Sequence, residues 1–111
     1  MKSCTSYCQL FLFSIVLLFV KPVTAQETDQ WESAMLQFEE LDRTHTYPPQ
    51  SIFFTGSSSI RLWETLEEDM HPYPVIQRGF GGSRMTDLLN HADRYIAGHS
   101  FGAMVVFVAN D

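Results

Sequence analysis

Apolar and polar residues recur at two spacings along this chain, and these spacings predict helices and strands in turn. Residues 29–42 place apolar side chains three or four positions apart, as on one face of a helix, and Asp29 with Glu32 has the spacing of a capping box. The expected apolar face contains Trp31, Ala34, Met35, Phe38 and Leu41. Pro48 and Pro49 then end the helix. The run "SIFFTG" is short, aromatic and β-branched, which is typical of a strand buried on both faces.

The second half of the chain repeats this alternation. Residues 60–69 have apolar positions at helical spacing, and a strand is expected near residues 74–78. Ser83 is placed to cap the next helix, whose expected face contains Met85, Leu88, Leu89, Ala92, Tyr95 and Ile96. The run "AMVVFVA" predicts a further buried strand. The order of a helix followed by β-α-β-α-β predicts an α/β fold, with a parallel sheet, right-handed crossovers and helices on both faces.

The first 25 residues have the pattern of a signal peptide. Lys2 precedes the uncharged apolar run Leu10–Val20, and small residues follow at Val23–Ala25. Cleavage after Ala25 is therefore expected, with a secreted or periplasmic product; an uncleaved anchor is the alternative. Eleven apolar residues are fewer than the roughly 20 that span a bilayer, so no stable membrane insertion is expected after cleavage. Residues 26–111 are expected to form a single domain.

Removal of the signal would change the composition of the chain. Both cysteines, Cys4 and Cys8, and both lysines would be lost, leaving five arginines against 13 acidic residues, a net charge of −8 with histidines neutral. Without cysteines no disulfide is expected, and four scattered histidines do not form a metal-binding pattern. The acidic balance argues against nucleic acid or anionic lipid as a partner, because both are bound through clustered Lys and Arg.

Clusters of polar residues and glycines follow each expected strand, at Gly56–Ser59, Gly79–Ser83 and Asn110–Asp111. The carboxyl ends of parallel strands share one edge of a sheet, where ligands bind. A serine between a strand and a helix places its hydroxyl at this edge, beside the N–H groups of the helix start. Such an arrangement supplies the nucleophile and the oxyanion donors of acyl transfer. Alone, the G-S-S-S segment is more simply a helix cap, but three clusters on one edge favour a functional site.

Three blocks of the sequence resemble the SGNH (GDSL-type) hydrolases, a family of esterases, lipases and acetylhydrolases. They look most like the subgroup of platelet-activating-factor acetylhydrolases. "FFTGSSSIRLW" resembles the first block, with Ser57 where Asp is more usual. "VIQRGFGGS" resembles the second, with Gln77 where Asn is common, and "VVFVAND" resembles the third, with Val108 where a glycine is usual. The resemblance implies a three-layer, flavodoxin-like fold, of which this chain would contain the N-terminal three strands.

The same resemblance implies roles for three residues. Ser58 would be the nucleophile, and its own N–H, the Gly82 N–H and the Asn110 side-chain amide would form the oxyanion hole. The implied reaction is hydrolysis of a carboxylic ester of a small molecule, a glycan or a lipid, without a cofactor or metal. The family's base and its partner lie in a D-x-x-H motif beyond the third block. The catalytic His and Asp are therefore expected beyond residue 111, and residues 26–111 alone are expected to be inactive.

Other interpretations compete with this one. "DRTH" (Asp42–His45) has the D-x-x-H spacing but precedes Ser58, and is interpreted as a coincidence; His71 and His91 are interpreted as surface or packing residues. "GHSFG" matches the G-x-S-x-G elbow of α/β-hydrolases with Ser100 as nucleophile, but a helical pattern precedes it and a strand pattern follows it, the reverse of what the elbow requires. A non-catalytic exported domain that binds carbohydrate or acyl ligands, or an inactive fragment, is the alternative to an enzyme.

Overall fold

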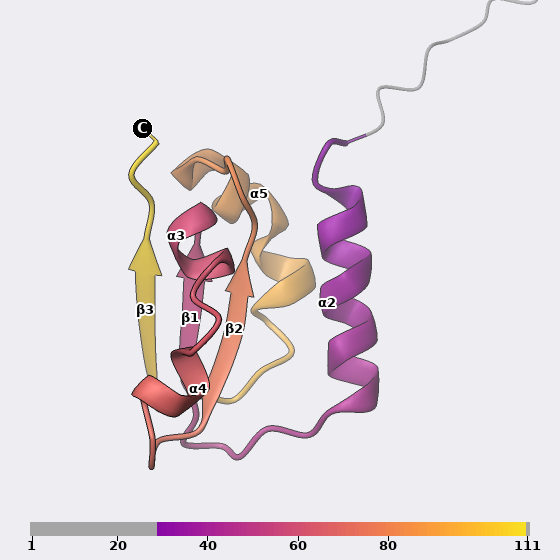
Figure 1. Ribbon diagram of the computed structural model, residues 1–111. Helices are drawn as coiled ribbons and strands as arrows, with labels where there is room; N and C mark the ends of the chain where they lie inside the picture. The colour runs from indigo at the N-terminus through magenta and orange to yellow at the C-terminus, as the bar shows by residue number, and fades with distance from the viewer. Residues whose placement is uncertain (1–28, 111) are drawn as a thin grey trace, which may run out of the picture.

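The computed structural model describes residues 29–110, and the expected signal peptide, residues 1–25, lies outside the described residues. The elements in chain order are α2 (Glu32–Thr44), β1 (Ile52–Gly56), α3 (Ser58–Arg61), α4 (Leu66–Asp69), β2 (Val75–Gly79), α5 (Met85–Tyr95) and β3 (Ala103–Phe107). The three strands are parallel and lie side by side in the order β2-β1-β3 (Figure 1). The predicted α/β fold is confirmed, as three parallel strands in a flavodoxin-like arrangement.

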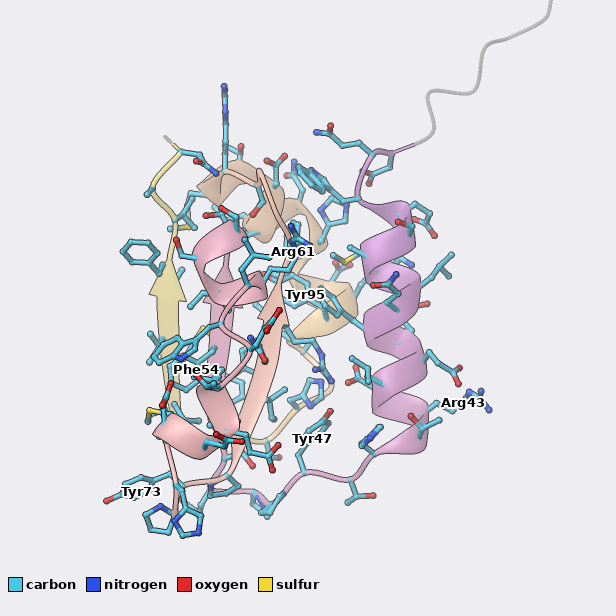
Figure 2. The ribbon with its side chains drawn as sticks, in the orientation of Figure 1. Arg43, Tyr47, Phe54, Arg61, Tyr73 and Tyr95 are labelled. Carbon is cyan, nitrogen blue, oxygen red and sulfur yellow. The ribbon has the colours of Figure 1, made fainter. Side chains whose placement is uncertain are left out.

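Successive side chains of β1 point to opposite faces of the sheet and divide the interior into two cores. Phe53 belongs to the larger core, which α2 and α5 cover, and Phe54 belongs to the smaller core, which α3 and α4 cover (Figures 1 and 2). The larger core contains Met35, Phe38, Phe53, Ile76, Phe80, Leu88 and Tyr95, and the smaller one Phe54, Ile60 and Leu66. The sheet is therefore the middle of three layers.

The crossover from β1 to β2 differs from the single helix expected over residues 60–69. It consists of two one-turn helices, α3 and α4, separated by a turn. Gln77 of β2 provides the reason. Its side-chain Nε2 donates to the carbonyl oxygen of Ile60 at 2.6 Å and to that of Trp63 at 2.9 Å. Carbonyl groups at the end of a helix need such partners, so the chain can leave α3 after one turn. The prediction of one continuous helix was wrong.

The start of α5 also differs from the expectation. Arg84, not Ser83, is the N-cap residue, and its N–H donates to the Asp87 carboxylate at 2.7 Å. Ser83 is fully buried, and its hydroxyl donates to the carbonyl oxygen of Gly56 at 3.4 Å. The prediction of a serine cap was wrong because this hydroxyl contacts the end of β1. On the expected apolar face, Met85 and Leu89 are exposed.

β3 lies at an edge of the sheet, and its five residues are exposed. The expectation of a buried strand is wrong for the described structure because no element of residues 29–110 covers the outer side of β3. On α2, Leu41 is likewise exposed, whereas Met35 and Phe38 are buried as predicted. In the part of the chain that the structure describes, no helix is long and apolar enough to cross a bilayer.

Candidate active site

The carboxyl edge of the sheet brings together the three clusters that the sequence singled out. The N–H of Phe80, in the loop after β2, donates to the carbonyl oxygen of Gly56 at 3.0 Å. The N–H of Ser57 donates to the carbonyl oxygen of Phe107, the last residue of β3, at 3.1 Å. The turn that carries Ser58 is therefore hydrogen-bonded to both neighbouring strand ends.

Gly56 allows β1 and β3 to approach closely at this edge. Its φ is +150°, and a Cβ at this position would lie 1.9 Å from the carbonyl oxygen of Phe107. No side chain fits in that space, and few residues other than glycine adopt this backbone conformation. The packing of the two strands thus requires the glycine of "TGSSS", and this requirement is independent of any catalytic role of the serines that follow it.

The three consecutive serines have different surroundings. Ser57 is the N-cap residue of α3 and is buried, Ser58 is the first helical residue and is half-buried, and Ser59 is exposed. The hydroxyl of Ser58 has no hydrogen-bond partner among residues 29–110. The first N–H groups of a helix lack acceptors within the helix, so α3 provides no acceptor for the N–H of Ser58. Ser58 combines an accessible hydroxyl with adjacent backbone donors.

Gly82 and Asn110 lie in one hydrogen-bonded loop region. Gly82 is exposed and has a φ of +79°, a backbone conformation that favours glycine. The Asn110 Nδ2 donates to the carbonyl oxygen of Ser83 at 3.1 Å, and Ser83 in turn contacts Gly56. A side-chain amide has two N–H donors, so one Asn110 donor remains for another acceptor. The polar residues that follow β1, β2 and β3 therefore form one contiguous group.

His91 of α5 pairs with Asp29, which lies just before α2. Its Nε2 is 2.5 Å from Asp29 Oδ2, and its Nδ1 is 2.8 Å from the carbonyl oxygen of Asp87. A carbonyl and a carboxylate both accept, so this arrangement favours the protonated imidazole, in which both ring nitrogens donate. Burial opposes this charge, but the hydrogen bonds to Asp87 and Asp29 outweigh it, so the pKa of His91 is raised above 6.5. The Trp31 N–H and His91 hold the pKa of Asp29 below 3.8.

This pairing changes the interpretation of His91. An imidazole whose two nitrogens both donate has no lone pair with which to take a proton, so His91 is not placed to act as a base. His91 was expected to be a surface or packing residue; it is buried, with 8% of the residue exposed, but the expectation missed the ion pair. Asp29 and His91 are 62 positions apart, and no local pattern in the sequence connects them.

The other histidines lie away from Ser58. His99 precedes β3, and its Nε2 is 3.1 Å from Asp42 Oδ1. His45, the C-cap residue of α2, contacts the Leu41 carbonyl oxygen through Nδ1 at 3.2 Å. Both line a cavity of about 470 Å³ near the amino ends of the strands. His71 is exposed in the turn between α4 and β2. No histidine among residues 29–110 is positioned as a base for Ser58.

Two competing motifs can be placed in the same way. Asp42 of "DRTH" pairs with Arg78 at 2.5 Å, not with His45, in agreement with the interpretation of that motif as a coincidence. Ser100 is exposed in the loop between α5 and β3, so it precedes a strand instead of following one. This is the reversed context expected for "GHSFG", and it does not form a nucleophile elbow. Within residues 29–110, no group of three or more His, Cys, Asp or Glu could hold a metal ion.

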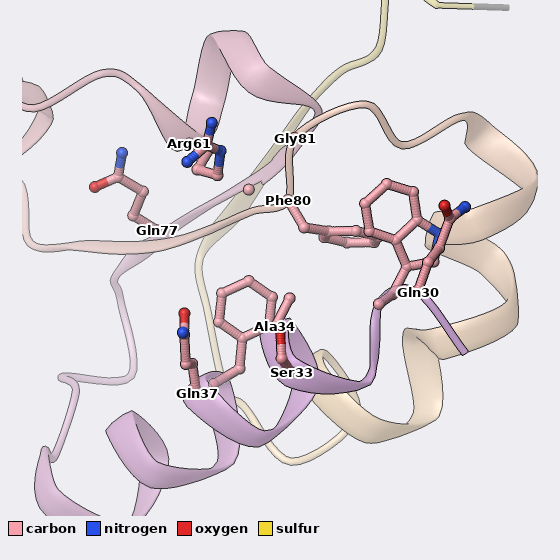
Figure 3. A pocket seen from close by; sticks show the side chains of 11 residues that line it. Gln30, Ser33, Ala34, Gln37, Arg61, Gln77, Phe80 and Gly81 are labelled. Carbon is pink, nitrogen blue, oxygen red and sulfur yellow. The ribbon is translucent and has the colours of Figure 1, made fainter. Parts of the chain in front are cut away.

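A cavity of about 400 Å³ opens beside the candidate site (Figure 3). Its walls come from the start of α2, from Arg61 on α3, and from β2 with the loop that follows it. Trp31 also lines it, and the Cη2 atom of Trp31 is 3.6 Å from the position that a Cβ of Gly82 would take. The cavity therefore borders the glycine loop. Neither this cavity nor the position of Arg61 could be predicted from local patterns, because the walls of the cavity come from segments distant along the chain.

Comparison with known proteins supports the fold. No protein-family model matches the sequence, and no curated protein matches it. A solved structure from Streptococcus pneumonia, described as "a putative platelet activating factor", is similar, with a TM-score of 0.62 and 18% sequence identity. The alignment covers 95% of this chain and 44% of that chain, so this chain spans less than half the length of that protein. At this identity the likeness shows a shared α/β fold.

Proposed function

We propose that this chain carries the nucleophile and the oxyanion hole of a serine-dependent carboxylic ester hydrolase. The main support is the hydrogen-bonded convergence of the Gly56–Ser58 turn, the Gly82 loop and Asn110 at the carboxyl edge of the sheet. The sequence blocks that resemble SGNH hydrolases supply these same three segments. The structural likeness to the pneumococcal protein adds weaker support for a hydrolase fold.

The proposed reaction proceeds through an acyl-enzyme. The Oγ of Ser58 attacks the ester carbonyl carbon while a general base takes the hydroxyl proton. The carbonyl oxygen becomes an oxyanion, which accepts hydrogen bonds from the N–H groups of Ser58 and Gly82 and from the remaining N–H of the Asn110 amide. The C–O bond to the alcohol then breaks, and the alcohol leaves with the proton from the base. Water, deprotonated by the same base, attacks the acyl carbon, releases the carboxylic acid and restores Ser58.

The general base is the component that residues 29–110 do not supply. His91 is engaged through both nitrogens, and the other histidines lie elsewhere. Unassisted serine is a poor nucleophile. By resemblance to the family, the base and its carboxylate come from a D-x-x-H segment beyond residue 111. A protein without that segment would bind esters without cleaving them, which is the competing function of a non-catalytic binding domain.

The test begins with the exported protein from its native source. Its intact mass establishes whether the chain extends beyond residue 111, and its cleavage of short-chain 4-nitrophenyl esters is then measured. We expect Ser58→Ala to abolish cleavage, and Ser59→Ala and Ser100→Ala to retain it. Retained activity in Ser58→Ala, or its loss in Ser100→Ala, would overturn the assignment of the nucleophile. Ester binding without cleavage in the native protein would favour the binding domain.

We also propose that residues 1–25 direct export and are removed, leaving residues 26–111 within one domain. The charged Lys2, the apolar run Leu10–Val20 and the small residues at Val23–Ala25 support this proposal. N-terminal sequencing of the protein from the extracellular or periplasmic fraction should give Gln26 as the first residue. A protein that starts at Met1 and sediments with membranes would support the uncleaved anchor instead.

A further inference from the structure

The cavity beside β2 has a charge that differs from that of the whole chain. Its eleven lining residues include one charged side chain, Arg61, and no carboxylate. The chain as a whole carries 13 acidic residues against seven lysines and arginines. The other polar side chains of the cavity are neutral: Gln30, Ser33, Gln37 and Gln77. The net charge of the protein is negative, but the charge that lines this cavity is positive, so the cavity favours an anion.

Arg61 is one of two arginines whose guanidinium pairs with no carboxylate among residues 29–110; the other, Arg84, is exposed at the start of α5 and does not line the cavity. Arg43, Arg78 and Arg94 each pair with an acidic side chain at 2.5–2.7 Å. Within residues 29–110, the guanidinium of Arg61 has neither an ion pair nor a hydrogen bond. It lies over the backbone of Gly81, where a Cβ would be 2.8 Å from Arg61 Nε. Because Gly81 has no side chain, the guanidinium of Arg61 can occupy this space.

The cavity is lined by residues that lie close to Ser58 and Gly82 in the chain. Arg61 follows Ser58 by three positions on the single turn of α3, so both belong to one rigid segment. Gly81, which contacts Arg61, immediately precedes Gly82. Trp31 lies between the cavity and Gly82. A group held in the cavity would therefore be the neighbour of an ester bond positioned at Ser58.

We propose that this cavity is a subsite for a negatively charged group of the substrate, a carboxylate or a phosphate, and that Arg61 determines the specificity for it. A guanidinium binds both groups through two parallel N–H···O hydrogen bonds. The amide side chains of Gln30 and Gln37 provide further donors, and the rings of Trp31 and Phe80 offer an apolar surface beside the charge. The part of this proposal in which the anion belongs to an ester rests on the proposed function. The binding of an anion in the cavity does not depend on that function.

The experiment uses non-reactive probes and the fluorescence of Trp31. The chain has two tryptophans, so Trp63→Phe leaves Trp31 as the reporter. Benzoate, phenyl phosphate and the neutral benzyl alcohol are titrated into this full-length variant, and calorimetry on the native protein repeats the titrations without the substitution. Both anions, or one of them, should bind saturably and more tightly than benzyl alcohol. The ratio of the two affinities distinguishes a carboxylate from a phosphate subsite.

Matched arginine variants decide whether Arg61 is responsible. Arg61→Gln should weaken anion binding about tenfold or more, since hydrogen bonds to charged groups are among the stronger ones, and leave benzyl alcohol unaffected. Arg43→Gln removes the same charge from an exposed position on α2 and should leave the affinity for the anions unchanged. Equal binding of neutral and anionic probes, or native anion binding in Arg61→Gln, would overturn the proposal.

Ser58→Ala separates this proposal from the proposed function. It should bind the anions as the native protein does while losing ester cleavage. Anion binding that depends on Arg61 in a protein that cleaves no ester would uphold the subsite and count against the hydrolase. Cleavage that depends on Ser58, with neutral and anionic esters cleaved equally by native protein and Arg61→Gln, would do the reverse.

Discussion

The Nη2 atom of Arg78 lies 2.5 Å from Oδ1 of Asp42. This ion pair joins a buried side chain of β2 to the last turns of α2. Arg78 is 2% exposed, and its guanidinium lies over the rings of Phe38 and Tyr47, with 5.5 and 5.3 Å to the ring centroids. A buried guanidinium is costly unless it is paired and hydrogen-bonded. The pair therefore fixes α2 against the sheet, and α2 also provides a wall of the cavity beside Ser58.

Asp42→Asn should lower the free energy of unfolding by about 3 kcal/mol, because it leaves the buried charge of Arg78 without its carboxylate. Urea denaturation measures the change. Glu40→Gln is the matched control, since the Glu40–Arg43 pair lies on the same helix but is exposed to solvent, where Arg43 points away from the protein (Figure 2). Its loss should cost less than about 0.5 kcal/mol. Similar effects of the two substitutions would show that Arg78 does not depend on Asp42.

Gly56→Ala should prevent β3 from pairing with β1, since its Cβ would lie 1.9 Å from the Phe107 carbonyl oxygen. We expect a loss of about 3 kcal/mol in unfolding free energy, or failure to fold, because backbone atoms must move. Gly98→Ala is the control, because a Cβ there has no atom within 4 Å. Thermal unfolding followed by circular dichroism compares the two. A native-like melting temperature for Gly56→Ala would contradict the close approach of the strands.

The Asp29–His91 pair should make stability depend on pH within a defined window. The pKa of His91 is raised, so its contribution is fully present below pH 6.5 and is lost as the pH rises through the higher folded value. The pKa of Asp29 is lowered, so its contribution is present above pH 3.8 and is lost as the pH falls through the lower folded value. Both contributions are complete between these limits.

The measurement is the melting temperature of native protein and His91→Gln from pH 3 to pH 9. The difference between them should be largest between pH 3.8 and 6.5 and should decrease on either side. Asp29→Asn should remove the acidic limb of this profile. A difference that does not change with pH would mean that His91 stabilises the fold through packing alone.

If the proposed function holds, Asn110→Ala should reduce ester cleavage about a hundredfold or more, mainly in kcat, through the loss of the proposed oxyanion donor. Asn110→Asp, which keeps the shape but removes the amide donor, should have a similar effect. Asn90→Ala, at an exposed position on α5, should leave the rate unchanged. If Asn110→Ala raises KM and spares kcat, the amide holds the substrate and does not stabilise the oxyanion.

Val106→Lys should reduce self-association of the protein. Within residues 29–110, Val106 is 44% exposed on β3, an edge strand whose outer backbone groups have no strand beside them in that range and, with its apolar side chains, favour pairing with other chains. Leu89→Lys is the control, because Leu89 is even more exposed, at 68%, but lies on α5 away from the sheet edge. Light scattering against concentration compares the variants. Equal improvement by both substitutions would point to general apolar exposure instead of edge pairing.

Most of the fold could be predicted from local patterns. The strands and the two long helices follow from apolar spacing and from the prolines and glycines between them, and these signals lie within each element. The one-turn helices α3 and α4 could not be predicted, because the contact that ends α3 comes from Gln77. The cap of α5 was misassigned for the same kind of reason, since the hydroxyl of Ser83 contacts Gly56, 27 positions earlier.

The candidate site was predictable only where it follows strand ends. Ser58, Gly82 and Asn110 come directly after expected strands, and a parallel sheet places such positions on one edge. The cation at His91 and the unpaired guanidinium of Arg61 had no comparable signal. Their chemistry depends on which side chains face them after folding, and these partners come from distant parts of the chain.

The double hydrogen bond from Gln77 has a consequence for the position of Ser58. A single helical turn has almost no stability of its own in water, so α3 exists because the rest of the protein holds it. The orientation of Ser58 and Arg61 is thus set at a distance, by an amide on the neighbouring strand whose donors reach the carbonyl oxygens of Ile60 and Trp63. Substitutions in β2 can therefore change the orientation of Ser58, the proposed nucleophile, without altering α3 itself.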